Sequence, residues 1–104
     1  MYFYTMNLIE KNKNHINKIC SQYKVAKLFV FGSVLTNRFS EESDVDFVVD
    51  FDNVTLPEYA DNYFDLKSEL EKILNRKVDL LEEKAIRNPF LRKSIDSSKV
   101  LVYG

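Results

Sequence analysis

The stretch LFVFGSVLTNRFSEESDVDFVVDFD, residues 28–52, holds the features that decide the fold. It opens on four consecutive apolar residues, stops at Gly32, crosses a polar loop and enters a second apolar run through Asp44 and Asp46. A carboxylate costs several kcal/mol to take out of water without a partner. Two acids at the start of a core strand therefore need a partner or a chemical role.

The two apolar runs predict two strands of one sheet. Lys27–Phe31 lacks polar alternation, which is typical of a strand covered on both faces. Asp44–Phe51 alternates, so Val45 and Phe47 point to one side while Asp44 and Asp46 point to the other. We therefore expect a buried strand that carries acids on its second face.

The sequence outside this stretch predicts helices that alternate with strands. Thr55 and Glu58 have capping-box spacing with a proline between them, and the helix that they begin carries apolar residues at helical spacing. The full predicted order is helix Asn7–Tyr23, strand Lys27–Phe31, short helix Val34–Phe39, strand Asp44–Phe51, helix Thr55–Arg76, strand Lys77–Leu81, helix Glu82–Ile95 interrupted at Asn88-Pro89, and strand Lys99–Tyr103. We expect an α/β (α+β) domain, with helices flanking a small mixed β-sheet.

Length and composition limit the class of protein. The 104 residues are 45% hydrophobic and 30% charged, which favours one globular domain over residues 1–104. A net charge of -1 gives no long-range attraction to nucleic acid, and no apolar run approaches membrane-spanning length. Met1–Met6 is expected to be a tail or an edge strand. His15 is expected to be structural or exposed and Cys20 to be a small buried hydrophobe, and the single cysteine makes the cytoplasm the default setting.

Three acids suggest a metal site. Asp44 and Asp46 lie two residues apart on a strand, so their side chains share a face with Cα atoms about 6–7 Å apart. Asp79 is the natural third ligand if its strand lies beside theirs. Mg²⁺ takes one or two carboxylates together with substrate phosphates, and two such ions serve in-line displacement at phosphorus. Asp50 lies about 13 Å along the strand from Asp46 and is expected outside this site.

Gly32 and Ser33 supply a complementary anion site. Glycine lets the backbone approach a ligand closely, and the N–H groups that follow at a helix start can bind phosphate. Each feature has a plainer interpretation, since Gly-Ser is more often a turn and a lone Asp-x-Asp is as often solvated. Their occurrence in order within one short chain favours phosphoryl or nucleotidyl transfer.

The segment GSVLTNRFSEESDVDFVVDF, with KVDLL and the ending NPFLRKSIDSSKVLVYG, resembles the minimal nucleotidyltransferases of the DNA polymerase β superfamily. The resemblance implies the nucleotidyltransferase fold and transfer of AMP from ATP. It implies that Asp44, Asp46 and Asp79 bind two Mg²⁺ ions, and that Asp79 also accepts a proton from the attacking hydroxyl. The implied nucleotide-binding residues are Gly32, Ser33, Arg38 and Ser43. Many members carry Arg-Gly where this chain has Thr36-Asn37, which leaves Arg38 as the nearest cation.

The resemblance also implies a partner. Minimal nucleotidyltransferases are commonly encoded with a HEPN-domain toxin, which the nucleotidyltransferase neutralises as an antitoxin and can adenylylate, in a homo- or hetero-oligomer. A non-catalytic antitoxin or nucleotide-binding module that acts by binding remains the alternative. A sugar transferase that uses Asp-x-Asp is a third reading, which is disfavoured because the chain is short and the Gly-Ser strand end has no role in it.

Overall fold

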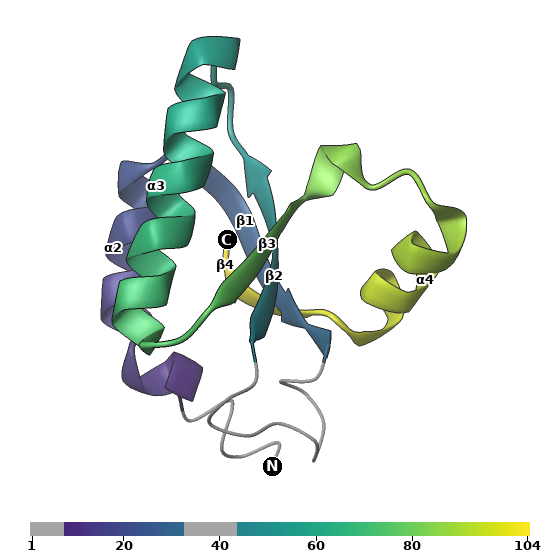
Figure 1. The fold of residues 1–104 in the computed structure, drawn as a ribbon, viewed down its shortest axis with the longest axis horizontal. Helices are drawn as coiled ribbons and strands as arrows, with labels where there is room; N and C mark the ends of the chain where they lie inside the picture. Colours follow the sequence, from purple (N-terminus) through teal and green to yellow (C-terminus); the bar gives the residue numbers. More distant parts are fainter. Residues whose placement is uncertain (1–7, 33–43) are drawn as a thin grey trace.

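A computed structural model describes residues 8–32 and 44–104 of the chain. The described elements surround one four-stranded sheet of order β3-β2-β1-β4, with α2 and α3 on one face and α4 on the other (Figure 1). The elements are α2 Lys13–Gln22, β1 Val25–Phe31, β2 Val45–Phe51, α3 Leu56–Leu74, β3 Val78–Glu82, the short 3₁₀ helix η2 Glu83–Ala85, α4 Pro89–Ser98 and β4 Val100–Tyr103.

The sheet is mixed because its central strands have neighbours of both kinds. β2 runs antiparallel to β1 and parallel to β3, while β4 runs antiparallel to β1 at the other edge. The parallel pair is connected by α3, which crosses over the sheet as parallel connections require. This confirms the predicted mixed sheet with flanking helices.

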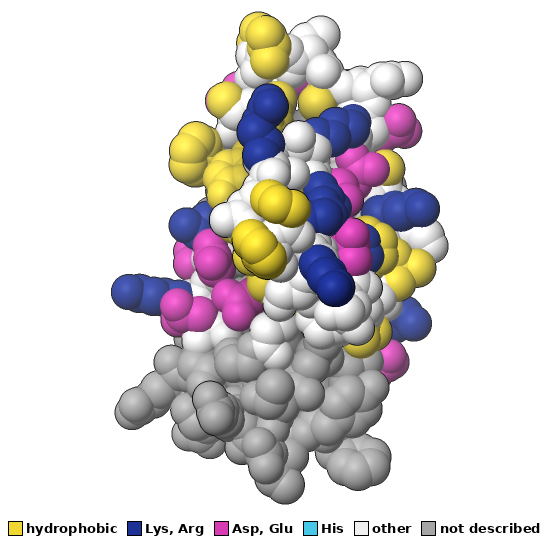
Figure 2. Space-filling view, turned by 90° about the vertical axis from the view of Figure 1, so that its right-hand side faces the viewer, with side chains coloured by type: hydrophobic (Ala, Val, Ile, Leu, Met, Phe, Trp, Pro, Cys, Tyr) yellow, Lys and Arg dark blue, Asp and Glu magenta, His cyan; other side chains and the backbone are white. Residues whose placement is uncertain are grey.

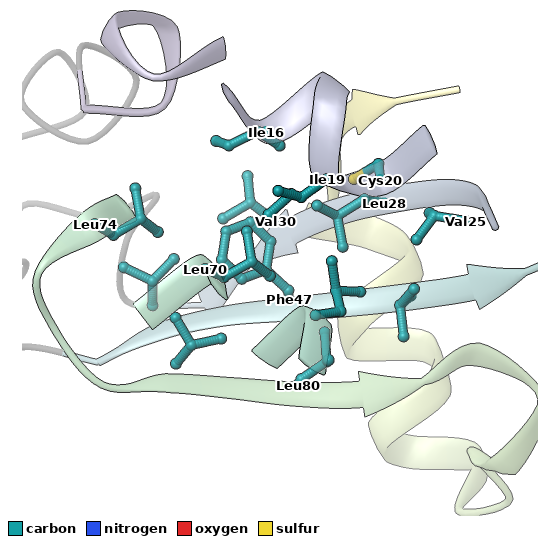
Figure 3. Packing of buried hydrophobic residues seen from close by; sticks show 14 of the residues in the cluster. Ile16, Ile19, Cys20, Val25, Leu28, Val30, Phe47, Leu70, Leu74 and Leu80 are labelled. Carbon is teal, nitrogen blue, oxygen red and sulfur yellow. The ribbon is translucent and has the colours of Figure 1, made fainter. Parts of the chain in front are cut away.

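The main hydrophobic core lies between the sheet and the helices α2 and α3 (Figure 3). Phe47 at the centre of β2 is fully buried, as are Leu28 and Val30 of the adjacent strand. Leu66 and Leu70 of α3, four residues apart and therefore on one helix face, cover them from above. Alternation along β2 thus sends one set of side chains into this core and the acids to the opposite face.

A smaller apolar layer lies on the side of α4. Val48 of β2 and Ile95 of α4 are buried, but neither belongs to the main core cluster. Phe29 and Phe31 of β1 are half-buried on this second face. The strand Lys27–Phe31, expected to be covered on both faces, is therefore fully covered by α2 and α3 and only partly covered on the side of α4, which Figure 2 views from outside.

Side-chain hydrogen bonds cap the N-termini of α3 and α4. The hydroxyl of Thr55 accepts the Glu58 backbone N–H, and the Glu58 carboxylate accepts the Thr55 backbone N–H, so the predicted capping box is confirmed. Asn75 ends α3 in the left-handed conformation at φ 54°. At α4 the Asn88 side chain accepts the backbone N–H groups of Phe90 and Leu91 at 2.9 and 3.2 Å.

The free edge of β3 is bonded by side chains of α3. The Glu71 carboxylate accepts the backbone N–H of Val78 at 3.0 Å. The Tyr63 hydroxyl donates to the backbone carbonyl of Leu80. Two backbone groups on an edge strand are thereby satisfied within the chain, as buried or half-buried backbone groups generally are.

Several predicted boundaries need correction. The helix expected over Asn7–Tyr23 is interrupted at Asn12, whose side-chain amide donates to the carbonyl of Leu8 at 2.9 Å. The helix expected from Glu82 does not begin there, because Glu82 pairs with Val49 as the last residue of β3. Only η2 follows before the break at Asn88-Pro89, which was predicted. The short helix Val34–Phe39 and the Met1–Met6 tail lie outside the described residues.

No helix in the described ranges is both long and apolar enough to span a membrane.

His15 is exposed and Cys20 is buried, and burial raises the pKa of the Cys20 thiol to about 12. A thiol with so high a pKa stays protonated at neutral pH and is a poor nucleophile. His15 is thus exposed, one of the two alternatives expected for it, and Cys20 is the small buried hydrophobe that was expected.

The capping box predicts a measurable contribution to stability. Thr55→Ala removes the acceptor for the Glu58 N–H and is expected to cost about 1 kcal/mol, a fall in Tm of about 4–8 °C. Thr55→Ser keeps the hydroxyl and serves as the control. Thermal unfolding followed by circular dichroism checks this, and equal Tm values for the alanine and serine variants would contradict it.

Candidate active site

Strand pairing brings two of the predicted acids to the same level of the sheet. β2 and β3 are parallel, and Asp46 lies directly beside Asp79 in their register. Adjacent strands are about 4.8 Å apart, and paired residues of parallel strands point to the same face. Asp44, two residues before Asp46, shares that face at the start of β2.

The acid face is the one opposite the main core. Val45 and Phe47, which flank Asp46, are fully buried beneath α2 and α3. Asp44 and Asp79 are exposed and Asp46 is half-buried. The backbone N–H of Val45 donates to the carbonyl of Lys77 at 3.1 Å, which fixes the start of β2 against β3. The three acids thus stand on a rigid sheet, with their carboxylates open to a ligand.

Gly32 completes the described part of the site. It follows β1, whose last residue Phe31 is paired with Asp46. Its φ is +82°, and a Cβ at this position would lie 2.5 Å from Oδ2 of Asp46. Residues with a side chain rarely adopt this conformation, and here there is also no room for one. Glycine therefore allows the backbone after β1 to lie against the Asp46 carboxylate.

Asp46 has an unfavourable environment for a negative charge. Burial, followed by repulsion from Asp79 and then from Asp44, raises the pKa of Asp46 to about 6. The aspartate reference pKa is about 3.9, so the fold holds this carboxyl where ionisation is costly. A cation placed between these carboxylates would offset both the repulsion and the lost solvation.

The acids alone do not surround a metal ion, and substrate phosphates would have to complete its coordination. Within residues 8–32 and 44–104, no three acidic, cysteine or histidine side chains lie close enough to enclose an ion. Mg²⁺ does not require such a cage, because it binds through one or two carboxylates and fills its remaining positions with water and phosphate oxygens. Asp44 and Asp46 share one face of the strand and their carboxylates repel each other, so this pair suits that mode of binding.

Some predicted residues lie elsewhere. Ser33, Arg38 and Ser43 fall outside the described residues. Asp50, expected outside the metal site, lies at the other end of β2, where its Oδ1 is 3.5 Å from Nζ of Lys84.

Sequence reasoning did not single out Lys77. Lys77 and Asp79 are exposed while Val78 between them is buried, so this alternation puts a cation on the acid face. The two-residue spacing from Asp79 was the available signal. In the parallel register Lys77 stands one position before the Val45–Val78 pair, at the level of Asp44.

An Asp-x-Asp strand, a third acid on the parallel strand beside it and a glycine against the central carboxylate now stand together. A family model described as a nucleotidyltransferase domain matches residues 13–102. The chain belongs to the nucleotidyltransferase domain family. Among curated relatives of this nucleotidyltransferase, Methanocaldococcus jannaschii MJ1379 is 39% identical over 90 residues, 86% of this chain and 89% of the relative, and is provisionally named a protein adenylyltransferase. The Thermococcus cleftensis protein adenylyltransferase MntA is 30% identical over 74 residues, 71% of this chain and 72% of that protein.

Solved structures share the fold. A protein provisionally described as a minimal nucleotidyltransferase superposes with a TM-score of 0.69 at 28% identity, covering 96% of this chain and 95% of the other. A toxin–antitoxin structure with AMP-PNP has a TM-score of 0.69 at 22% identity, covering 89% and 73% of the two chains. A tri-AMPylated Shewanella oneidensis HEPN toxin in complex with its MNT antitoxin gives 0.63 at 19% identity, covering 92% and 72%. The last two likenesses concern the fold alone.

The raised pKa of Asp46 predicts a pH-dependent stability without metal. Below about pH 4 the carboxyl is neutral in both the folded and unfolded states. As pH rises to about 6 the folded state holds the extra proton, so stability falls across this range. Asp46→Asn removes the effect, and in EDTA its Tm advantage over the unmodified chain is expected to grow from pH 4 to pH 7.

Thermal unfolding at several pH values checks this expectation. Asp61→Asn on the exposed surface of α3 is the control, with no growing advantage expected. Added Mg²⁺ at pH 7 should narrow the gap, because the cation stabilises only the chain with the carboxylate. A Tm difference that is the same at every pH would contradict the raised pKa of Asp46.

Gly32 gives a second prediction. Gly32→Ala puts alanine at a positive φ that it disfavours and a Cβ against Asp46, with an expected loss of at least about 1 kcal/mol in the free energy of unfolding. In the double variant Gly32→Ala/Asp46→Ala the clashing carboxylate is absent, so the two losses should not add. Urea unfolding of the four proteins of this cycle measures the coupling, and simple additivity would refute the contact.

Proposed function

We propose that this nucleotidyltransferase transfers AMP from ATP to a hydroxyl of a partner protein, and that the partner is a HEPN-domain toxin for which the chain is the antitoxin. The observation that carries the proposal is that Asp46, Asp79 and the end of β1 lie at the same level of the sheet. The names of the curated relatives support protein adenylylation. Because ATP is an intracellular metabolite, the proposal places the protein in the cytoplasm.

The donor binds at the end of the two central strands, where β1 ends and β2 begins. Gly32, with Ser33 after it, presents backbone N–H groups to the triphosphate, as glycine at a strand end allows. Asp44 and Asp46 hold Mg²⁺, of which two ions are expected, and Asp79 contributes to one of them. The bound Mg²⁺ supplies charge neutralisation at the phosphates. Lys77 adds a positive charge on the same face.

The transfer itself is a displacement at the α-phosphorus. The acceptor hydroxyl oxygen forms a bond to this phosphorus while the bond to the bridging oxygen breaks, and pyrophosphate leaves. Asp79 takes the hydroxyl proton, a role that suits an exposed carboxylate beside Asp46. Holding the two reactants on a rigid sheet lowers the entropic part of the barrier.

The acceptor is proposed to come from another chain. The described residues form one domain around one sheet, with none of its elements left over to enclose a second substrate. The Shewanella oneidensis complex pairs an MNT antitoxin of the same fold with a tri-AMPylated HEPN toxin. A partner of that class supplies the missing half of the site and would make the working unit a hetero-oligomer.

A non-catalytic antitoxin is the second candidate. It has the same fold and the same partner, and differs only in that no AMP is transferred. An antitoxin of this kind neutralises its partner by binding and does not depend on the acids. The two candidates therefore differ in the effect of an aspartate variant on toxin neutralisation.

The catalytic proposal is tested with ATP labelled at the α-phosphate, Mg²⁺ and the HEPN-domain protein of the same genome. Asp44→Ala/Asp46→Ala should reduce label incorporation at least about a hundredfold, since metal assistance is worth several kcal/mol and each 1.4 kcal/mol is tenfold. Asp50→Asn is the matched control, because Asp50 lies on the same strand but contacts Lys84. Undiminished labelling by the double variant would overturn the assignment.

Cell protection separates the two candidates. If catalysis neutralises the toxin, the double aspartate variant should still bind the HEPN-domain protein yet fail to protect cells that express it. Full protection by this variant would favour the non-catalytic antitoxin.

A further inference from the structure

The proposed base, Asp79, stands on an edge strand. In the sheet order β3-β2-β1-β4, the strand β3 has a neighbour on one side only. An edge strand lacks the second row of backbone bonds that holds a central strand such as β2. A catalytic group has to stay within about 0.5 Å of its productive position, and a misplacement of about 1 Å can lower a rate about a hundredfold. Asp79 therefore needs support on the outer edge of β3.

Side chains of α3 make two hydrogen bonds on this outer edge. The Glu71 carboxylate accepts the backbone N–H of Val78 at 3.0 Å, and the Tyr63 hydroxyl donates to the backbone carbonyl of Leu80. Val78 and Leu80 are the residues directly before and after Asp79. The two bonds thus bracket the residue that carries the proposed base.

The two side chains on α3 are themselves held in place. Glu71 and Tyr63 are half-buried, and Tyr63 packs against the main core. The ring of Tyr63 lies edge-on to that of Tyr59, with 6.2 Å between the ring centroids, and to that of Phe64, with 5.3 Å. A hydrogen bond to a charged group such as the Glu71 carboxylate is roughly twice as strong as one between neutral groups. A packed helix therefore presents both groups to β3.

Tyr63 also lies within the influence of the Asp79 charge. Burial, followed by the negative charge of Asp79, raises the pKa of Tyr63 above its ordinary value. The hydroxyl therefore keeps its proton at neutral pH and stays a donor to the Leu80 carbonyl. The residue that fastens the strand is thus close to the carboxylate that the strand carries.

The main core cannot give the same support. The side chains of Val78 and Leu80 point into the core beneath α3, which fixes the register of β3 (Figure 3). Asp79 points to the opposite face and is exposed. Apolar packing therefore determines which residue of β3 lies beside Asp46, whereas the two edge bonds limit how far the backbone at Asp79 can move.

We infer that Tyr63 and Glu71 are positioning residues for Asp79, and that their bonds to Leu80 and Val78 hold its carboxylate beside Asp46. Both act through Asp79 and contact neither ATP nor the acceptor. The inference rests on the proposed function, because Asp79 accepts a proton only if the chain transfers AMP to a hydroxyl. It extends the set of residues that determine the rate to the helix on the other face of the sheet.

The test measures kcat and KM for ATP with the HEPN-domain protein of the same genome as acceptor, at a temperature well below the Tm of every variant. Tyr63→Phe keeps the packed ring but loses the hydroxyl, and should lower kcat about tenfold with KM for ATP unchanged, since Gly32 and Asp44 are untouched. Glu71→Ala should act in the same way, and Glu71→Gln, which keeps an acceptor oxygen, should restore most of the rate.

Tyr59→Phe is the matched control and should leave kcat unchanged. Tyr59 lies one turn earlier on α3, and its hydroxyl has no hydrogen-bond partner among residues 8–32 and 44–104. An unchanged kcat in Tyr63→Phe or in Glu71→Ala would overturn the role assigned to that residue. An equal loss in Tyr59→Phe would overturn the inference as a whole.

A double variant separates positioning from a general effect on the structure. In an Asp79→Asn background the base is absent, so the addition of Tyr63→Phe should leave the residual rate unchanged. A merely structural role of Tyr63 would lower the rate by the same factor in both backgrounds, and that result would overturn the inference.

Amide hydrogen exchange gives a result that does not depend on catalysis. Exchange over Val78–Glu82 should be about tenfold faster in Tyr63→Phe than in Tyr59→Phe, while exchange in β1 stays the same, because only the outer edge of β3 loses a bond. Equal exchange in the two variants would overturn the inference. Faster exchange in a protein whose unmodified chain labels no acceptor would instead overturn the proposed function, and with it the catalytic role of both residues.

Discussion

Parallel pairing between β2 and β3 is the constraint on which the candidate site depends. It places Asp79 beside Asp46 although α3 separates them in the chain. The pairing in turn depends on the apolar face of the same strands, because Phe47 and Leu80 are anchored in the main core. A shift of one residue would turn that apolar face to solvent, so the hydrophobic core also fixes the register of the acids.

The fold and the site differ in how far the sequence determines them. Periodicity and local signals were sufficient to predict the order of helices and strands along the chain, the capping box at Thr55 and the break before Pro89. The boundary at Glu82 was wrong because pairing with Val49 outweighed local helix propensity. The break at Asn12 was missed for a related reason, since an asparagine side chain can bond the backbone in place of the helix.

The acids themselves were readable from the sequence, but their environment was not. The spacing of Asp44 and Asp46 predicts a shared face once the segment is recognised as a strand. The contact between Gly32 and the Asp46 carboxylate depends on how β1 aligns with β2, which is a tertiary property. The same holds for the raised pKa of Asp46, because its causes are burial and acids from two strands. The fold therefore concentrates charge at a place where a purely structural protein would avoid it, as functional sites commonly do.

The side-chain bonds from α3 to β3 bear on how this protein can assemble. The Glu71 carboxylate bonds the Val78 N–H and the Tyr63 hydroxyl bonds the Leu80 carbonyl, so two backbone groups on that edge of the sheet are already taken and are not available to another chain's strand. Sheet extension from the β3 side, which is also the side of Asp79, is thereby disfavoured. A second chain is therefore expected to contact this edge through side chains rather than by adding a strand. The strand that carries Asp79 is thus protected from pairing with another copy of the protein.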